Sequence, residues 1–163
     1  MADKPLRVLH VIGAAKPGGA ETFAVRLISA LDRHKGVEIA VVARRGWAAT
    51  RLKAQGVRVM EAPFGGLWDV LLSAFGMGTA GRVRRAALAF RPDVIQSWMN
   101  RASRFVPQGR WATVGRLGGF YNLKYYFNKV KYLIGNTEEI VDYCIREGWP
   151  KDKVVHIANF VPV

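Results

Sequence analysis

The sequence predicts an α/β fold in which a doubly wound, mostly parallel sheet is covered by helices on both faces. Short apolar runs that favour strands alternate along the chain with segments whose apolar residues recur at helical spacing. A glycine-rich loop joins the first such strand to the first such helix. Because this alternation implies right-handed crossovers and parallel pairing, we expect ligands outside the carboxyl ends of the strands.

The first strand, loop and helix are the clearest elements. Arg7–Ile12 (RVLHVI) is a short apolar run that ends at a glycine, as is typical of a buried parallel strand. The loop Gly13–Gly19 (GAAKPGG) follows. In Ala20–Arg33 the apolar residues recur at helical spacing, and Glu21 occupies the first turn, where the helix dipole favours negative charge. Gly36 then ends this helix.

A second helix separates the next two strands. Val37–Ala43 (VEIAVVA) predicts a strand, Ala48–Gln55 a short helix closed by Gly56, and Val57–Met60 a third strand. The first part of the chain therefore has the order strand, helix, strand, helix, strand.

The second part of the chain continues the alternation. A helical stretch that includes Val83–Phe90 comes before Pro92, and the segment DVIQSW after this proline predicts the fourth strand. Trp111–Val114 and Tyr132–Ile134 predict two further strands.

The last helix and strand complete the pattern. Thr137 is placed to cap a helix whose first turn holds Glu138 and Glu139 and which ends near Glu147. Lys153–Ile157 (KVVHI) predicts the last strand. With no internal repeat or low-complexity linker, the 163 residues predict one domain.

The charge balance predicts an anionic partner. Lys and Arg number 25 against 12 Asp and Glu, which gives a formal net charge of +13. Such a charge favours a phosphorylated small molecule, an anionic membrane surface or a nucleic acid. Half of the residues are apolar or aromatic, which is enough for a sizeable core and argues against disorder.

The expected compartment is the cytoplasm. Cys144 is the only cysteine and cannot form an internal disulfide, and the start MADKPLRVLH lacks the apolar run of a secretory signal. The longest apolar stretch, Leu67–Met77, is interrupted by Asp69 and is well short of the roughly 20 residues that span a bilayer. Any membrane contact would therefore be at the surface.

The loop after the first strand is the first candidate site. Gly13, Gly18 and Gly19 lie where backbone N–H groups and the helix dipole can receive a phosphate. Gly19-Ala20 follows Gly18 in place of the Lys-Ser or Lys-Thr of an ATPase P-loop, and no Gly-x-Gly-x-x-Gly fingerprint is present. From spacing alone, a flexible turn without a ligand explains the loop equally well.

The window Val94–Thr137 is the second candidate site, because it has no Asp or Glu but many cations and aromatic rings. The cations are Arg101, Arg104, Arg110, Arg116, Lys124, Lys129 and Lys131. The rings are Trp98, Phe105, Trp111, Phe120, Tyr121, Tyr125, Tyr126, Phe127 and Tyr132. This mixture suits a phosphorylated sugar, a lipid head group or a single-stranded nucleic acid, unless the rings are core and the charges solvated.

No metal or cofactor is expected. His10 and His156 lie within predicted strands, which indicates core or rim positions, and His34 ends a helix. The histidines lack metal-ligand spacing and no cysteine pair is present. Cys144, within a helix, is expected to be a small packed residue.

Several segments resemble one known family in their order and spacing. The opening VLHVIGAAKPGGAET, then RPDVIQSWM, and finally YLIGNTEEIVDYCIREGWPKDKVVHIANFV are similar to the amino-terminal domain of a large retaining glycosyltransferase family of the B type. This family contains many bacterial lipopolysaccharide and polysaccharide transferases. The resemblance covers essentially the whole chain.

The resemblance implies one Rossmann-like half of a two-domain enzyme. Residues 1–163 would be the acceptor-side domain, and the nucleotide-sugar would lie mainly on a carboxyl-terminal donor-binding domain, in the same chain or a partner chain. Without that domain the chain is expected to be inactive. The backbone of Gly18 and Gly19 would approach the donor diphosphate. The family implies no metal, and a location in the cytoplasm, at the inner face of the membrane.

The resemblance also implies an acceptor site on this domain. Gln96 and Trp98, at the end of the fourth strand, would shape it, and Tyr121 would contact the acceptor. Arg116 and Lys124 would contact a phosphate on the acceptor or on the donor. Family members commonly have a histidine at the end of the fourth strand and another after the fifth strand. This sequence has Gln96 and Trp98 in the first of these regions and Arg116 in the second. We therefore assign no catalytic residue. The alternative function is a basic module that binds RNA or single-stranded DNA, although the chain lacks a recognisable nucleic-acid-binding signature.

Overall fold

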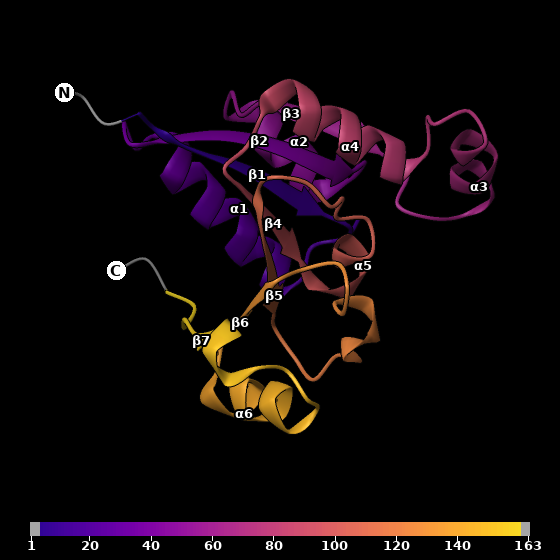
Figure 1. The fold of residues 1–163 in the computed structure, drawn as a ribbon. Coiled ribbons are helices and arrows are strands. Elements are labelled where there is room, and N and C mark those ends of the chain that lie inside the picture. The colour runs from indigo at the N-terminus through magenta and orange to yellow at the C-terminus, as the bar shows by residue number, and fades with distance from the viewer. Residues whose placement is uncertain (1–3, 161–163) are drawn as a thin grey trace.

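A seven-stranded sheet with the strand order β3-β2-β1-β4-β5-β6-β7 forms the centre of the protein (Figure 1). The computed structural model describes residues 4–160. Every pair of neighbouring strands is parallel, so the predicted doubly wound α/β fold is confirmed, with an entirely parallel sheet. The chain builds outward from β1 to β3 on one side and from β4 to β7 on the other.

The observed elements agree with the predicted alternation. The strands are β1 (Leu6–Ile12), β2 (Val37–Arg44), β3 (Val59–Ala62), β4 (Val94–Trp98), β5 (Ala112–Leu117), β6 (Tyr132–Gly135) and β7 (Val154–His156). The helices are α1 (Gly19–Asp32), α2 (Trp47–Ala54), α3 (Leu67–Ser73), α4 (Thr79–Phe90), α5 (Met99–Ser103) and α6 (Glu138–Arg146), with short 3₁₀ turns η1 (Leu123–Tyr125) and η2 (Lys151–Lys153). The helices α3 and α5 were not predicted.

The predicted bounds of the third strand, Val57–Met60, are wrong, because β3 begins at Val59 and ends at Ala62. Gly56 has a positive φ of 83°, and the Val57 amide returns to the carbonyl of Leu52 in α2. Val57 thus belongs to the capping turn of the preceding helix and cannot join the ladder.

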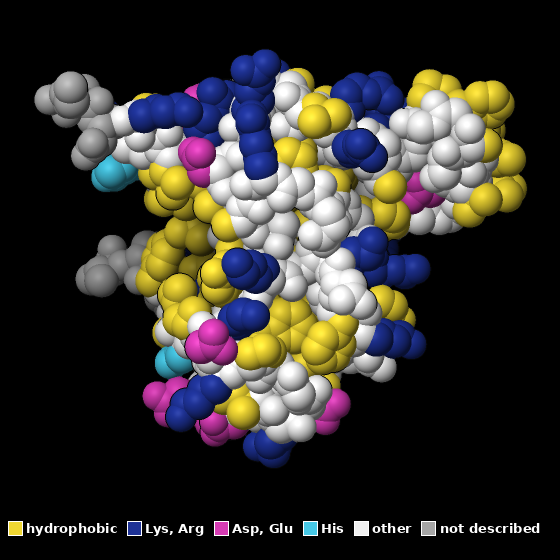
Figure 2. All heavy atoms as spheres, in the orientation of Figure 1, with side chains coloured by type: hydrophobic (Ala, Val, Ile, Leu, Met, Phe, Trp, Pro, Cys, Tyr) yellow, Lys and Arg dark blue, Asp and Glu magenta, His cyan; other side chains and the backbone are white. Residues whose placement is uncertain are grey.

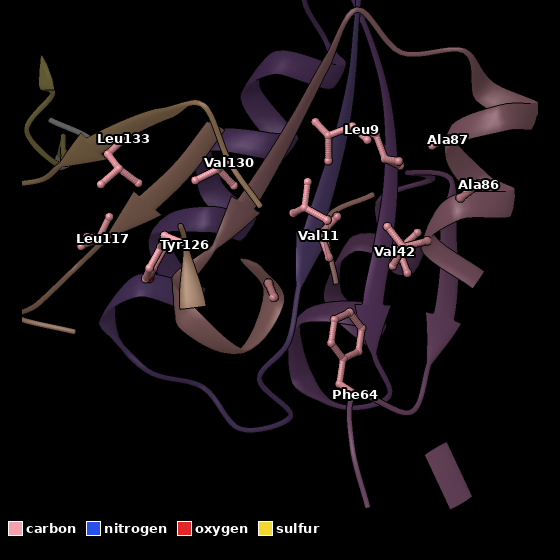
Figure 3. Packing of buried hydrophobic residues seen from close by; sticks show 14 of the residues in the cluster. Leu9, Val11, Val42, Phe64, Ala86, Ala87, Leu117, Tyr126, Val130 and Leu133 are labelled. Atoms are coloured by element: carbon pink, nitrogen blue, oxygen red, sulfur yellow. The ribbon is translucent and has the colours of Figure 1, made fainter. Parts of the chain in front are cut away.

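Each face of the sheet has its own apolar core. On one face, β1 and β2 pack against α1 and α2, where Phe23, Ile28 and Leu52 are buried. On the other face, the strands pack against α4, α5 and α6; Figure 3 shows Val42 pointing from β2 toward α4. Cys144 is fully buried in this second core, as predicted, and burial raises the pKa of its thiol to about 11.

The predicted cap of the last helix is confirmed. The hydroxyl of Thr137 accepts a hydrogen bond from the Ile140 amide at 3.3 Å, and Glu138 and Glu139 occupy the first turn of α6. Negative charge at this end complements the helix dipole.

His10 lies in the middle of the sheet, on β1, and is fully buried, as predicted for a core or rim residue. Its Nδ1 accepts a hydrogen bond from the Trp98 indole nitrogen at 3.3 Å, which leaves the proton on Nε2. Burial lowers the pKa of His10 to about 3, so the imidazole is neutral in the folded protein at neutral pH. His156, in contrast, is exposed at the rim.

We expect the free energy of unfolding to fall as the pH drops from about 6.5 toward 3. In this window the unfolded chain binds a proton on His10, whose ordinary pKa is 6.5, whereas the folded protein does not. The loss between pH 7 and pH 5 is about 2 kcal/mol, from about 1.4 kcal/mol per pH unit. Urea unfolding of the wild type and of His10→Gln at pH 7 and pH 5 measures this loss in the free energy of unfolding. If the two proteins lost the same amount, His10 would not be its source.

Candidate functional site

Two cavities open at the carboxyl edge of the sheet, on either side of Met99. The Arg116 cavity, of about 140 Å³, is lined by Gly19, Ala20, Phe23, Trp98, Met99, Arg116, Leu117, Gly118, Asn136 and Asn159. The Tyr121 cavity, of about 440 Å³, is lined by Ala14, Ala15, Lys16, Glu21, Arg44, Trp98, Met99, Asn100, Arg101 and Tyr121. Both lie where ligands of parallel α/β sheets bind.

The amino-terminal end of α1 faces the Arg116 cavity. Gly18 is the N-cap and supplies no side-chain cap, so the first amides of this 14-residue helix lack the partners that a capping side chain would give. A side chain added at Gly19 would meet nothing within 4 Å, whereas one at Gly18 would lie 2.6 Å from the carboxylate of Glu21. The predicted loop therefore presents Gly19 to open space and Gly18 to a packed carboxylate.

Two helices hold this loop in place. The Trp47 amide at the start of α2 donates to the carbonyl of Ala15 at 3.0 Å, and a side chain on Gly46 would overlap that carbonyl. Gly13 packs against α5, because a Cβ there would lie 2.9 Å from Cγ of Arg101. These contacts argue against a freely flexible turn.

Arg116 is a buried cation without an acidic partner. At the end of β5 it is only 5% exposed, and within residues 4–160 it forms no salt bridge to a carboxylate. Its Nη2 donates to the carbonyl of Ile157 at 2.8 Å and to the Asn159 side-chain oxygen at 2.9 Å. Burial lowers the pKa of Arg116, but a guanidinium stays charged at neutral pH. A buried charge is costly unless it is paired.

Aromatic rings pack against this guanidinium. Its carbon lies 4.8 Å from the ring centre of Phe23 and 5.8 Å from that of Trp98. Trp98 is 4% exposed and lines both cavities. The rings stabilise the cation through their negative faces but leave its charge uncompensated.

Met99 and Asn136 belong to the site although the sequence did not predict them. Met99 lines both cavities in a left-handed conformation, with a φ of 61°, which costs of order 1 kcal/mol for a side chain of this size. The side-chain oxygen of Asn136 is buried in the Arg116 cavity and has no hydrogen-bond partner among the described residues. The only sequence signal was that each residue directly follows a strand.

Tyr121 lines the second cavity and contacts Met99, the residue that separates this cavity from the Arg116 cavity. Its hydroxyl donates to the sulfur of Met99 at 3.2 Å, and burial, with the nearby Glu21 carboxylate, raises the pKa of this phenol. Lys16, Arg44 and Arg101 add positive charge to the lining of the same cavity.

Gln96 and Lys124 line neither cavity. Gln96 is half-buried within β4, opposite His10, and Lys124 is exposed on η1 with its ammonium 5.0 Å from the ring centre of Tyr125. The structure thus brings together Gly19, Trp98, Arg116 and Tyr121 of the predicted site. The predicted acceptor contacts of Gln96 and Lys124 stay predictions.

The basic and aromatic window of the sequence divides between core and surface. Trp98 and Tyr126 are buried, whereas Phe120 and Phe127 are exposed. Among residues 4–160, no group of three or more His, Cys, Asp or Glu side chains is arranged to hold a metal ion.

Two curated proteins of Rhizobium meliloti (strain 1021) are similar in sequence. The lipopolysaccharide core biosynthesis glycosyltransferase LpsD is 33% identical over 156 residues, which cover 95% of this chain and 43% of LpsD. The corresponding enzyme LpsE is 33% identical over 150 residues, which cover 89% of this chain and 41% of LpsE. The chain therefore spans less than half the length of either relative.

Solved structures share the fold at low sequence identity. HepE of Anabaena, crystallised with UDP and glucose, has a TM-score of 0.71 at 18% identity over 96% of this chain and 45% of HepE. The UDP-GlcNAc 2-epimerase of Neisseria meningitidis, bound to UDP-GlcNAc, has a TM-score of 0.69 at 16% identity over 94% of this chain and 46% of the epimerase.

The family follows from a sequence profile. The profile of Glycosyltransferase Family 4 matches residues 17–163, which include the last three residues of the glycine loop, the residues that line the Arg116 cavity and all strands but the first. This match favours the glycosyltransferase interpretation over a module that binds RNA or single-stranded DNA. The chain belongs to Glycosyltransferase Family 4.

Proposed function

We propose that this chain is the acceptor-side, amino-terminal domain of a glycosyltransferase of the lipopolysaccharide core type. The enzyme would transfer a sugar from a nucleotide-sugar to a glycan or lipid-linked acceptor. The donor-binding domain would belong to the same polypeptide or to a partner chain. The sequence similarity to LpsD and LpsE, and the coverage of less than half of each, support this assignment.

The Arg116 cavity is the observation on which the proposal mainly rests. It combines the free amides of α1 with a buried guanidinium that forms no salt bridge to any carboxylate of residues 4–160. Both features favour a phosphate oxygen over a neutral ligand. Fixed donors of this kind stabilise the negative charge that develops on a leaving diphosphate.

The Tyr121 cavity suits the acceptor. Its volume of about 440 Å³ is in the range of small-molecule sites. Tyr121 and Trp98 supply aromatic rings, and Lys16, Arg44 and Arg101 supply cations. Glu21 adds one negative charge to the same lining, so the three cations leave it net positive, which favours a sugar that carries phosphate or carboxylate groups.

The enzyme would work at the cytoplasmic face of a membrane, where lipid-linked acceptors are presented. In residues 4–160 no helix has the length and apolar character needed to cross a bilayer. The net charge of +13 favours an anionic surface, to which each nearby Lys or Arg contributes on the order of 1 kcal/mol.

Replacing Gly19 with Ala tests the phosphate loop. The added methyl group meets no protein atom within 4 Å, so the fold tolerates it, but it enters the space that a diphosphate would occupy. We expect sugar transfer, measured with the donor-binding domain present, to fall at least tenfold with an unchanged melting temperature. Gly36→Ala, at the opposite edge of the sheet, is the control. Full activity of Gly19→Ala would contradict the proposal.

Replacing Arg116 with Met tests the anion site. Met keeps apolar contact with Phe23 and Trp98 but removes the charge and the two hydrogen bonds to Ile157 and Asn159. Because both acceptor residues are exposed and can bond to water, and the buried charge itself is costly, the melting temperature should change little. A charged hydrogen bond contributes roughly 1.5–3 kcal/mol, so we expect transfer to fall about tenfold or more. The exposed Arg110→Met is the control. A stable Arg116→Met protein with wild-type turnover and acceptor affinity would refute this role.

A further inference from the structure

The segment between β3 and α4 forms a lobe that projects from the body of the protein (Figure 1). We call residues 65–78, which include α3, the α3 lobe. Trp68 and Phe75 on it are 74% and 77% exposed. Leu67, Val70, Leu71 and Met77 are also exposed. Figure 2 shows hydrophobic side chains along the outer margin of this protrusion.

The polarity of this lobe is reversed relative to a helix that packs on a core. Its one charged residue, Asp69, is only 5% exposed, whereas its large apolar residues face outward. The Asp69 carboxylate accepts hydrogen bonds from the amides of Gly65 and Thr79, both at 2.6 Å, and from the Thr79 hydroxyl at 2.8 Å. These contacts close the base of the lobe and remove the only negative charge from its surface.

Arginines of α4 fix the lobe and border it. Arg82 donates to the carbonyls of Met77 at 2.9 Å and Glu61 at 3.0 Å, and Arg85 donates to the carbonyl of Gly76 at 3.2 Å. Arg84 and Arg85 are exposed. The apolar surface is therefore built on a hydrogen-bonded frame, and Arg82 and Arg85 lie directly beside it.

We infer that the α3 lobe enters the boundary between head groups and acyl chains of an anionic lipid leaflet. Trp and Phe favour this boundary, and the neighbouring arginines match anionic head groups. At seven residues, α3 is far too short to span a bilayer but long enough to lie within its surface. The inference rests on the proposed location at the membrane surface, and it names the segment that would contact the lipid.

Charge also distinguishes lipid from a second copy of the chain. Two copies that met through this lobe would bring their Arg82 and Arg85 side chains together without an acid on the lobe surface, because Asp69 is buried. An anionic leaflet, in contrast, neutralises these cations as the apolar side chains are buried.

Vesicle binding tests the inference. We expect the protein to sediment with vesicles that contain phosphatidylglycerol and far less with phosphatidylcholine alone, and high salt should weaken the binding. Trp68 is the most exposed tryptophan, because Trp98 and Trp149 are buried and Trp47 and Trp111 half-buried, so its emission should shift to the blue. Trp68→Phe should remove the shift and keep the binding.

Trp68→Ser with Phe75→Ser should lower vesicle partitioning at least tenfold, because each buried aromatic side chain contributes strongly. Leu6→Ser, which changes an exposed apolar residue outside the lobe, should bind like the wild type. Circular dichroism checks that both variants are folded. Wild-type partitioning of the double variant, or no vesicle binding at all, would overturn the inference, as would a dimer that the double variant abolishes.

The two proposals fail separately. Vesicle binding needs neither donor nor acceptor, so its absence leaves the transferase proposal standing. Conversely, a protein that binds vesicles through the α3 lobe but transfers no sugar with its donor-binding domain present would refute the proposed function alone.

Discussion

The arrangement of the site depends on one topological constraint. From β1 the chain builds β2 and β3 to one side, and after α4 it returns to the other side of β1 to form β4. Since the connections leave in opposite directions at the carboxyl ends of β1 and β4, no crossover covers this position. The first turn of α1 and the end of β4 therefore face a common space, into which Arg116 of β5 also reaches.

A continuous set of contacts joins the core of the sheet to this space. His10 is neutral and buried in β1, and its Nδ1 accepts a hydrogen bond from the indole N–H of Trp98, which fixes the position of the indole ring. Trp98 packs against Phe23 of α1, and both rings contact the guanidinium of Arg116. The position of the cation is thus determined by residues from three separate elements.

Local signals in the sequence predicted most of the fold. The strand runs, the glycine loop and the cap at Thr137 depend on residues close to one another, and the structure confirmed them. The start of β3 was missed because Val57 is apolar but takes part in the capping turn after Gly56. The helix α3 was missed because its apolar residues do not face a core.

The site was predicted less completely because it depends on contacts between distant segments. Gly19, Trp98, Arg116 and Tyr121 meet there. The sequence placed Gln96 in the fourth strand, but it did not indicate that this side chain lines neither cavity. Likewise, the isolation of Arg116 from every described carboxylate follows only from the packing of β5 beside β6 and the segment after β7.

The immobilised guanidinium also affects the entropy of ligand binding. Two oxygen atoms and two ring faces already hold Arg116 in one rotamer before any ligand arrives. A flexible arginine would lose about 0.5–1.5 kcal/mol of rotamer freedom on forming the same contact. Here that loss occurs during folding, so an incoming oxyanion meets a preorganised partner and retains more of its interaction energy as affinity.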